Sequence, residues 1–343
     1  MKCTIKDIAR ELQLSRNTVA KVLNHKGGVS EKTARLVLAK AREMNYQMVI
    51  DEGNASHTSI PTQQILLLAR ASVNYSGFWI QVMKGIEQVL RDTEYSLQLA
   101  MMDDDDIKNM RFPSVISSLS VIGLILVELC DRGVCEAALS YGLPTVTIDM
   151  PRDSEGIIGH MDIVTMENKE PVRALVSSLI SKGCRDFAFA GDVYTYNIGR
   201  GFQERYDALI EELAANGLAL NEKASMLRET DQQLMNISYI VSFLKRLDHL
   251  PQVYLCGNDW TAIQLMHGIQ FLGYSVPRDV SVIGFDNIPE STNTLPPLTT
   301  INTPKERLGI AAARCLLERI DDPSIPFVYS QYMTDIVIRG SSV

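Results

Sequence analysis

The sequence lacks the features that would place it in a membrane or outside the cell. None of its apolar runs is long enough to span a membrane, and residues 1–19 contain no apolar core of a signal peptide. The six cysteines, at positions 3, 130, 135, 184, 256 and 315, form no Cys-x-x-Cys pair. This scatter is typical of reduced thiols rather than of a disulfide framework or metal site. We therefore expect a cytoplasmic protein.

Motifs of common enzyme classes are also missing. The chain has no G-x-S-x-G, no G-x-x-x-x-G-K-[ST], no H-E-x-x-H and no complete G-x-G-x-x-G, and its five histidines pair with no cysteine or serine motif. Four aspartates at residues 103–106 could suggest calcium or magnesium, but such a run is more typical of a solvated loop. We expect no catalytic residues, no cofactor and no metal. An enzyme that borrows the fold stays open, without positive support.

The net charge of -8 is unevenly distributed along the chain. Residues 1–50 hold ten Lys and Arg against four acidic residues, a balance of +6, which leaves -14 for the remainder. A small basic segment on an acidic body suggests that the segment alone meets a polyanion. The 343 residues and the 46% hydrophobic content indicate a soluble chain of two or three units.

Apolar residues at helical spacing predict two short helices near the start of the chain, followed by a third. Thr4, Ser15 and Ser30 each precede one of these runs and are expected to cap it. Two short helices joined by a tight turn, with polar residues on the outer face of the second, indicate a helix-turn-helix. The alternative is an ordinary helical hairpin with charged outer faces.

Three motifs in this segment are similar to the DNA-binding head of the LacI family. Residues 4–9 read TIKDIA, residues 14–24 read LSRNTVAKVLN and residues 29–33 read VSEKT. The family pattern is roughly T-I-x-D-[VI]-A, V-S-x-x-T-V-S-x-V-L-N and V-S-x-x-T. The chain departs from it at Gln13, where the family has glycine, and we expect the turn to be slightly rearranged because a left-handed conformation is costly for Gln.

The resemblance implies which residues of the head contact DNA. Arg16 and Asn17 begin the second helix, with Lys21 one turn on, and would contact base edges, since Arg suits guanine and Asn suits adenine. Thr18, Asn24 and Ser30 are expected to contact phosphates. The helix caps Thr4 and Ser15 complete the predicted DNA-binding set.

Residues 47–63 read as a polar linker. The family normally has a Pro-Asn pair here and a hinge helix with A-x-x-L, which enters the minor groove with a leucine. The chain has neither motif, and Asp51-Glu52 would face phosphate. We expect the hinge helix to be absent; the alternative is a shortened version around Val49-Ile50.

From Gln64 onwards, apolar strand-like runs alternate with amphipathic helices, which indicates a parallel α/β architecture long enough for two lobes. The expected strands are residues 65–68, 97–101, 123–127, 145–148, 187–190, 253–255 and 281–284. The expected helices are residues 79–91, 171–182, 204–216, 234–247 and 261–272.

The resemblance to the LacI family continues through this body. Residues 276–287 read VPRDVSVIGFDN, close to the family's V-P-x-D-[VI]-S-V-x-G-[FY]-D-[DN]. Further similar segments are Phe78-Trp79 with Gly85-Ile86-Glu87, residues 142–149, 179–191, 204–207 and 296–301. The implied fold is a three-helix helix-turn-helix head plus a two-lobed, periplasmic-binding-protein-like α/β core with parallel sheets and Rossmann-like lobes.

The implied domains follow the same plan. Residues 1–46 form the DNA-binding head, residues 47–63 the linker, and residues 64–343 the effector-binding and dimerisation core. Within the core, we expect the first lobe at about residues 64–162 and 303–325. The second lobe is then expected at about residues 163–302 and 326–343.

Polar residues follow the expected strands, at the edge where parallel sheets bind ligands. Arg70, Asp149, Asp192, Asn258-Asp259 and Asp286 lie just past strand ends. The alternative is that Asp and Asn only cap the next helices, and that Phe78 and Trp79 are core residues rather than a platform for a sugar or base. With the resemblance, the predicted effector-binding set is Asn74, Phe78, Trp79, Asp149, Arg205, Asn258 and Asp286.

These observations predict a DNA-binding transcriptional regulator, a repressor, controlled by a small molecule bound between two lobes. Carboxylates and Asn accept hydrogen bonds from hydroxyls, which favours a sugar or polyol over a nucleoside or amino acid. Operator DNA and a second copy of the chain are the other expected partners, because two-fold operators mirror two-fold proteins. No membrane partner is expected. The rival is a solute-binding protein or effector sensor with the same two-lobed body.

Overall fold

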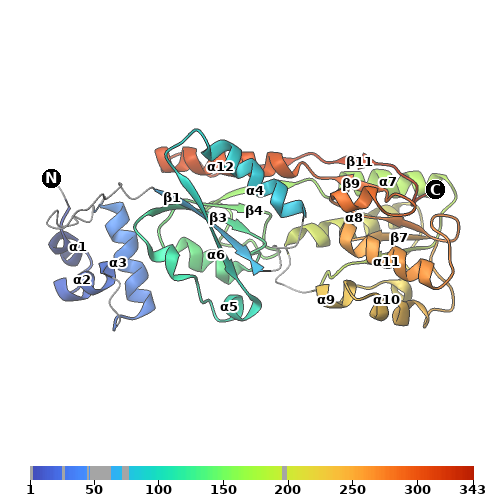
Figure 1. The fold of residues 1–343 in the computed structure, drawn as a ribbon, viewed down its shortest axis with the longest axis horizontal. Helices are drawn as coiled ribbons and strands as arrows, with labels where there is room; N and C mark the ends of the chain where they lie inside the picture. The colour runs from blue at the N-terminus through green and yellow to red at the C-terminus, as the bar shows by residue number, and fades with distance from the viewer. Residues whose placement is uncertain (1–2, 25–27, 45, 47–62, 72–76, 195–198) are drawn as a thin grey trace.

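The computed structural model describes residues 3–24, 28–44, 46, 63–71, 77–194 and 199–343. Along its long axis lie a helical head, a first α/β lobe and a second α/β lobe (Figure 1). Among the described residues, no helix is both long and apolar enough to cross a membrane. Residues 47–62 of the predicted linker at residues 47–63 lie outside the described residues, and so does Asn74. The expectation about the hinge helix therefore stays a prediction.

The head consists of three helices around a small apolar core. They are α1 (Ile5–Glu11), α2 (Arg16–Leu23) and α3 (Glu31–Glu43). Fully buried Ile8, Val19, Val37 and Ala41 bring one face of each helix into this core. The three predicted helices are thus confirmed.

The first lobe contains one parallel sheet with the strand order β10-β5-β4-β3-β1-β2. Its strands are β1 (Gln64–Arg70), β2 (Ser96–Met102), β3 (Val121–Val127), β4 (Thr145–Ile148), β5 (Asp162–Met166) and β10 (Tyr329–Tyr332). Helices α4 (Gly77–Leu90) and α12 (Lys305–Asp321) cover one face, while α5 (Asp104–Lys108) and α6 (Arg132–Leu139) lie on the other (Figure 1). A 3-10 turn spans Ser114–Ser117.

Helices α4 and α12 pack backbone against backbone. A side chain at Gly85 would collide with the carbonyl oxygen of Glu306, and one at Gly309 would collide with that of Val82. Because α12 begins just after the second lobe, this close packing anchors an interlobe crossing to the first lobe.

The second lobe has a three-stranded parallel sheet, ordered β6-β7-β8, and an antiparallel pair, β9 with β11. The strands are β6 (Phe187–Ala190), β7 (Val253–Cys256), β8 (Ser281–Ile283), β9 (Thr300–Asn302) and β11 (Asp335–Val337). The helices are α7 (Glu170–Ser181), α8 (Arg200–Ala215), α9 (Asp231–Leu234), α10 (Ile237–Leu244) and α11 (Asp259–Phe271), with 3-10 turns at Glu222–Ala224 and Pro289–Thr292.

The structure corrects two expectations about these lobes. Strands β5 and β10 both belong to the first-lobe sheet, so two crossings lie after Met166 and Tyr332 rather than at residues 162–163 and 325–326. The helix expected at residues 234–247 is the shorter α10, which begins after Asn236 because this residue accepts hydrogen bonds from the N–H groups of Ser238 and Tyr239, and the separate α9 ends at Leu234.

Candidate ligand site and nucleic-acid interface

The predicted base-reading residues lie on the outer face of the head. Arg16, Asn17 and Lys21 are exposed on α2, whose opposite face is buried in the head's core. Asn24 is also exposed, and its side-chain amide donates to the carbonyl of Ala20 at 2.7 Å. Helix α2 is therefore free on the side that would enter a major groove.

The predicted caps of the head helices are observed. Ser15 accepts a hydrogen bond from the N–H of Thr18 at 3.0 Å, and Ser30 accepts one from that of Thr33 at 3.2 Å. Thr4 forms a capping box with Asp7, to which it donates from its hydroxyl at 2.6 Å and from its N–H at 3.0 Å. DNA contacts by Thr4, Ser15, Thr18 and Ser30 stay predictions.

The turn between α1 and α2 keeps the conformation that glycine would favour. Gln13 has φ +53°, in the left-handed region. Its N–H donates to the carbonyl of Arg10, and that of Leu14 donates to Ala9, which is a Schellman ending of α1. The expected rearrangement of the turn is thus not seen; Gln13 takes the strained conformation instead.

Three acidic residues, Glu128, Asp149 and Asp286, follow the ends of β3, β4 and β8 with positive φ values of 53°, 74° and 107°. Backbone strain at non-glycine residues is typical of functional sites. Together with Arg205 and Lys305, they form what we call the interlobe cluster. The lobes meet beside this cluster, since a side chain at Gly199, just before α8, would collide with the carboxylate of Asp149 after β4.

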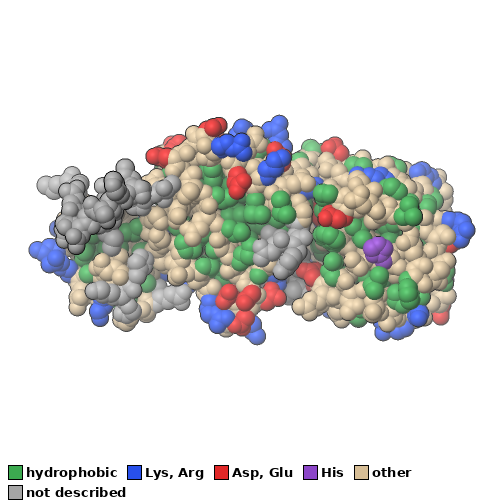
Figure 2. Space-filling model, viewed as in Figure 1, with side chains coloured by type: hydrophobic (Ala, Val, Ile, Leu, Met, Phe, Trp, Pro, Cys, Tyr) green, Lys and Arg blue, Asp and Glu red, His purple; other side chains and the backbone are tan. Residues whose placement is uncertain are grey.

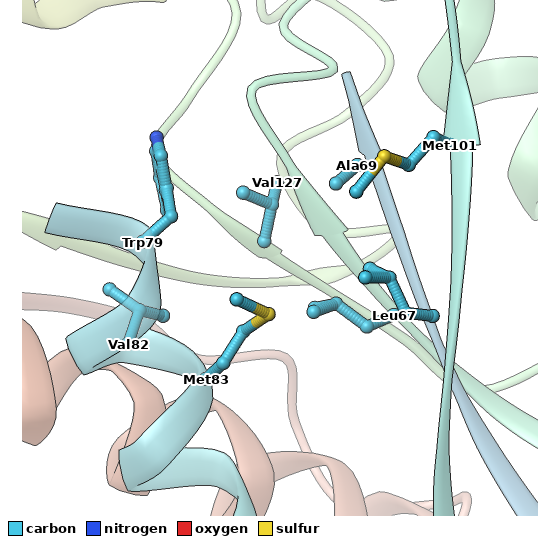
Figure 3. Close-up of a pocket in the computed structure, with 8 residues that line it drawn as sticks. Leu67, Ala69, Trp79, Val82, Met83, Met101 and Val127 are labelled. Atoms are coloured by element: carbon cyan, nitrogen blue, oxygen red, sulfur yellow. The ribbon is translucent and has the colours of Figure 1, made fainter. Parts of the chain in front are cut away.

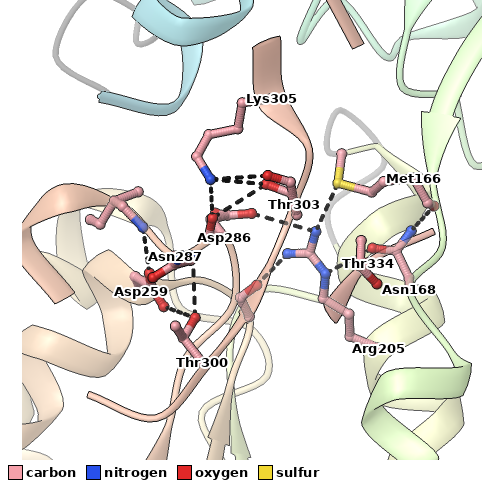
Figure 4. Close-up of polar contacts among 12 residues, drawn as sticks. Met166, Asn168, Arg205, Asp259, Asp286, Asn287, Thr300, Thr303, Lys305 and Thr334 are labelled. Atoms are coloured by element: carbon pink, nitrogen blue, oxygen red, sulfur yellow. Dashed lines mark hydrogen bonds and ion pairs between the residues drawn. The ribbon is translucent and has the colours of Figure 1, made fainter. Parts of the chain in front are cut away.

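Arg205, on α8, is the buried centre of this cluster, with 5% of its surface exposed. Its guanidinium donates to Asn168 Oδ1 at 3.0 Å and to the carbonyl of Gly257, and it lies 3.5 Å from the centre of the Phe285 ring. Asp286 Oδ1 is 3.9 Å away (Figure 4). The guanidinium is therefore held in one orientation by contacts on several sides.

Burial controls the protonation of the cluster's acids. It raises the pKa of Asp286 to about 6, although Arg205 and Lys305 act in the opposite direction. It also raises the pKa of Glu128 to about 7 and that of Asp149, which a hydrogen bond from the N–H of Met150 opposes. Lys305 donates to the backbone carbonyl of Asp286 and to that of Thr303. Carboxylates so poorly solvated gain from a ligand that donates hydrogen bonds to them.

Phe78 and Trp79 behave mainly as core residues, which was the alternative to a ligand platform. They are 6% and 5% exposed and meet edge to face at 4.6 Å. The Trp79 ring lines an apolar cavity of about 40 Å³ with Val82, Met83 and Val127 (Figure 3). Its Nε1 donates to Glu128 Oε1 at 2.6 Å, which links this core to the interlobe cluster.

Other strand-end residues serve local structure. Asn258 accepts from the N–H of Thr261 at 2.9 Å and caps α11, and Asp192 accepts from that of Tyr194 at 3.0 Å. Asp259 accepts from the N–H of Ile288 and the hydroxyl of Thr300, and burial raises its pKa to about 7. These contacts favour the capping interpretation for Asn258, whereas Asp192 bonds within the loop after β6 and caps no described helix.

Residues 103–106 form the start of α5 rather than a loop. Asp103 caps the helix by accepting from the N–H of Asp106 at 2.8 Å, while Asp104 pairs with Arg70 and Asp105 with Arg111. The acidic patch over α5 is visible in Figure 2, with basic side chains beside it. Within the described ranges, no group of three or more His, Cys, Asp or Glu is placed to hold a metal ion.

The sequence prediction missed Glu128, Asn168 and Lys305. Glu128 follows a predicted strand, so the strand-end rule applied to β3 would have found it. Asn168 and Lys305 follow β5 and β9, two strands that were not predicted. A short loop of the first lobe also contacts the second, since Arg200 donates from its N–H to the carbonyl of Met150 at 2.8 Å.

Comparisons with known proteins agree with this architecture. Residues 4–48 match the model of bacterial regulatory proteins of the lacI family, and residues 176–342 match a periplasmic binding protein-like domain. The chain is 30% identical to the HTH-type transcriptional repressor PurR of Glaesserella parasuis, with 98% of each chain covered. It is 24% identical to the probable HTH-type transcriptional repressor ExuR of Bacillus subtilis, again over 98% of each.

Solved structures show the same fold. A transcriptional regulator CelR–cellobiose complex superposes with a TM-score of 0.71 at 22% identity, covering 99% of this chain and 100% of that one. A lac repressor dimer bound to operator superposes with a TM-score of 0.69 at 21% identity, with both chains fully covered.

A helix-turn-helix head on a two-lobed α/β core, with a charged cluster between the lobes, defines a ligand-responsive class of DNA-binding protein. The chain belongs to the LacI family of bacterial regulatory proteins. It is accordingly a DNA-binding transcriptional regulator, as the sequence motifs of its head predicted.

Proposed function

We propose that the protein represses transcription from a two-fold operator and that a sugar or polyol, bound at the interlobe cluster, controls its affinity for DNA. The observation that carries the ligand class is the alternation of buried acids and cations in the cluster. A hydroxyl both donates and accepts, so a polyol can satisfy Asp149, Asp286 and Arg205 together. A purely anionic ligand would meet three carboxylates, and a purely cationic one would meet Arg205 and Lys305.

Sugars bound to solved proteins of the same fold support this ligand class. Among solved relatives of this fold, one carries cellobiose and another, from Enterococcus faecalis, carries ribose at a TM-score of 0.65 and 21% identity, with 82% of this chain and 98% of that one covered. A nucleobase would need an open aromatic face for stacking. Phe78 and Trp79, the aromatic pair predicted as a platform, are buried in the core of the first lobe and present no such face.

We further propose that the active form is a homodimer. Phe271 on α11 and Leu295 after the nearby 3-10 turn are 74% and 84% exposed, and Gln270 donates to the carbonyl of Leu295 at 2.5 Å. Large exposed apolar side chains brought together in this way are typical of subunit interfaces. Sedimentation velocity should give a dimer that Phe271→Ser weakens, whereas a monomeric wild type would contradict the proposal.

A thermal-shift screen of the full-length protein tests the ligand class. Sugars, polyols, nucleosides and amino acids are compared, and a true ligand at about one hundred times its Kd adds about 2.7 kcal/mol of stability. Positive sugars or polyols would support the proposal. Stabilisation by nucleosides or amino acids alone would contradict the proposed sugar or polyol. Binding to operator DNA selected in vitro would then test separately whether the protein is a DNA-binding regulator.

A further inference from the structure

Helix α3 lies between the rest of the head and the first lobe (Figure 1). From its last turn, Arg42 reaches into the first lobe and donates to the backbone carbonyls of Tyr141 at 2.5 Å, Ile116 at 3.2 Å and Ser118 at 3.4 Å. These carbonyls belong to two separate loops, one before β3 and one before β4. A single guanidinium thus ties the head to two segments of the lobe.

Further contacts extend this interface along α3. The guanidinium of Arg35 lies 5.1 Å from the centre of the Tyr141 ring and 5.7 Å from that of Phe112, two rings that also contact each other. Gly142 approaches so closely that a side chain there would come within 2.9 Å of Ala39 Cβ. Cation–π contacts and a tight backbone approach require a fixed geometry.

Leu119 completes the interface from the lobe side. It lies in the loop before β3 and packs against the apolar core of the head. The head's core is therefore closed partly by a residue of the first lobe. Burial lowers the pKa of Arg42 to about 10, so its guanidinium stays charged at neutral pH while it is held by these carbonyls.

We propose that the first lobe carries the DNA-binding head as a rigid attachment through α3, with Arg42 as its main fastening. Among the described residues, the contacts come from α3 and from the head's apolar core, while Arg16 and Asn17 stay exposed on the outer face of α2. The inference rests on the proposed function in one respect: an effector that moves the lobes then moves the two heads of a dimer directly. Coupling needs two arrangements that differ in operator contacts, and rigid attachment supplies that difference.

The attachment is tested first without DNA or ligand. Probes are placed at Glu11 in the head and Glu136 on α6, both exposed, through unnatural amino acids in the full chain, and their distance distribution is measured. The wild type should give one narrow distribution. Arg42→Ala, from the head side, and Leu119→Asp, from the lobe side, should each broaden it. Lys32→Ala, which removes an exposed cation of the same helix, should leave it narrow.

A broad wild-type distribution, or narrow distributions in both interface variants, would overturn the attachment. Circular dichroism of each variant verifies that its helices remain folded. Because this measurement needs neither operator nor effector, it can fail while the proposed function stands.

The functional consequence is measured as the effector-induced change in operator affinity. If the wild type shows a change of about tenfold, which is within the usual range for coupled sites, Arg42→Ala should reduce it to less than about twofold. Its affinity for a single operator half-site should be unchanged, because α2 is untouched. A loose head with the full effector response would overturn the role of the attachment in signalling. A wild type that binds no operator, or responds to no ligand, would instead contradict the proposed function.

Discussion

Arg205 Nη2 lies 3.9 Å from Asp286 Oδ1, and both residues belong to the second lobe. The guanidinium is fixed there by Asn168, Gly257 and the Phe285 ring before any ligand arrives. The first lobe contributes Asp149 and Glu128 from the ends of β4 and β3. Arg205 and Asp286 form the preformed half of the site, in the second lobe. A ligand bound to this half can also contact Asp149 and Glu128 of the first lobe, and the arrangement of the lobes would respond to binding in this way.

Replacing Asp286 tests this preformed half. We expect Asp286→Asn to weaken effector binding at least about tenfold, or about 1.4 kcal/mol, because the amide keeps the shape but loses the charge that pairs with Arg205 and accepts from hydroxyls. Asn tolerates the left-handed backbone at this position, so the loop should keep its conformation. Isothermal titration calorimetry with the ligand from the screen measures the effect.

The matched control is Asp335→Asn, an exposed carboxylate on β11 outside the cluster. Its effector affinity should equal that of the wild type. Unchanged affinity in Asp286→Asn would remove Asp286 from the site.

Glu128 should make stability depend on pH. Its pKa is about 7 in the folded chain and near the usual 4.5 when unfolded, so the folded state holds more protons between these values. The free energy of unfolding should therefore fall as pH rises from about 4.5 to 7. Gln does not titrate, so Glu128→Gln lacks this pH dependence. The free energy of unfolding of the wild type, measured relative to that of Glu128→Gln, should therefore fall by about 1–3 kcal/mol from pH 5 to pH 8.

Urea unfolding at several pH values measures that difference. Glu87→Gln, at an exposed position of α4, is the control and should follow the wild type at every pH. Parallel curves for wild type and Glu128→Gln would show that Glu128 is not held in a protonated state.

Arg16 should read a base rather than only attract phosphates. Arg16→Ala is expected to cost about 1–3 kcal/mol of operator affinity and to relax preference at one position, as is usual for a bidentate contact with a base. Fluorescence anisotropy with operator and with random DNA separates the two roles. Equal losses of affinity for operator and for random DNA would mean that Arg16 contacts only the phosphate backbone of the DNA.

Gln13 should be a site where glycine stabilises the head. Its φ of +53° is costly for a residue with a side chain, so Gln13→Gly is expected to raise stability by about 0.5–1 kcal/mol. Gln13→Ala keeps the Cβ and should give no such gain. Thermal unfolding followed by circular dichroism checks both, and a destabilised Gln13→Gly would mean that the Gln side chain contributes contacts of its own.

Local sequence rules predicted the features that depend on neighbouring residues. Ser15 and Ser30 cap helices because a hydroxyl needs only an N–H three residues away, and Thr4 begins α1 because Asp7, also three residues away, accepts from its N–H. Asp149 and Asp286 were found because parallel strand ends share one edge of a sheet. The same rule would have included Glu128.

Features that depend on distant partners escaped prediction. Strand β10, Tyr-Ser-Gln-Tyr, is an edge strand with partly exposed side chains and no apolar pattern, and it pairs with β5 more than 160 residues earlier. Arg42 bonds to backbone carbonyls, which every residue type carries, so no sequence signal marks its partners. Both required the folded chain.

The central claim is that a ligand at the interlobe cluster controls operator binding by the head. Its most direct measurement is the anisotropy of labelled operator, titrated with full-length protein in the presence and absence of the ligand from the screen. We predict that saturating ligand shifts the operator Kd of the wild type by about tenfold, and that a ligand concentration near the wild type's effector Kd gives a much smaller shift in Asp286→Asn than in the wild type. Identical wild-type titrations with and without a ligand that demonstrably binds the protein would contradict the account.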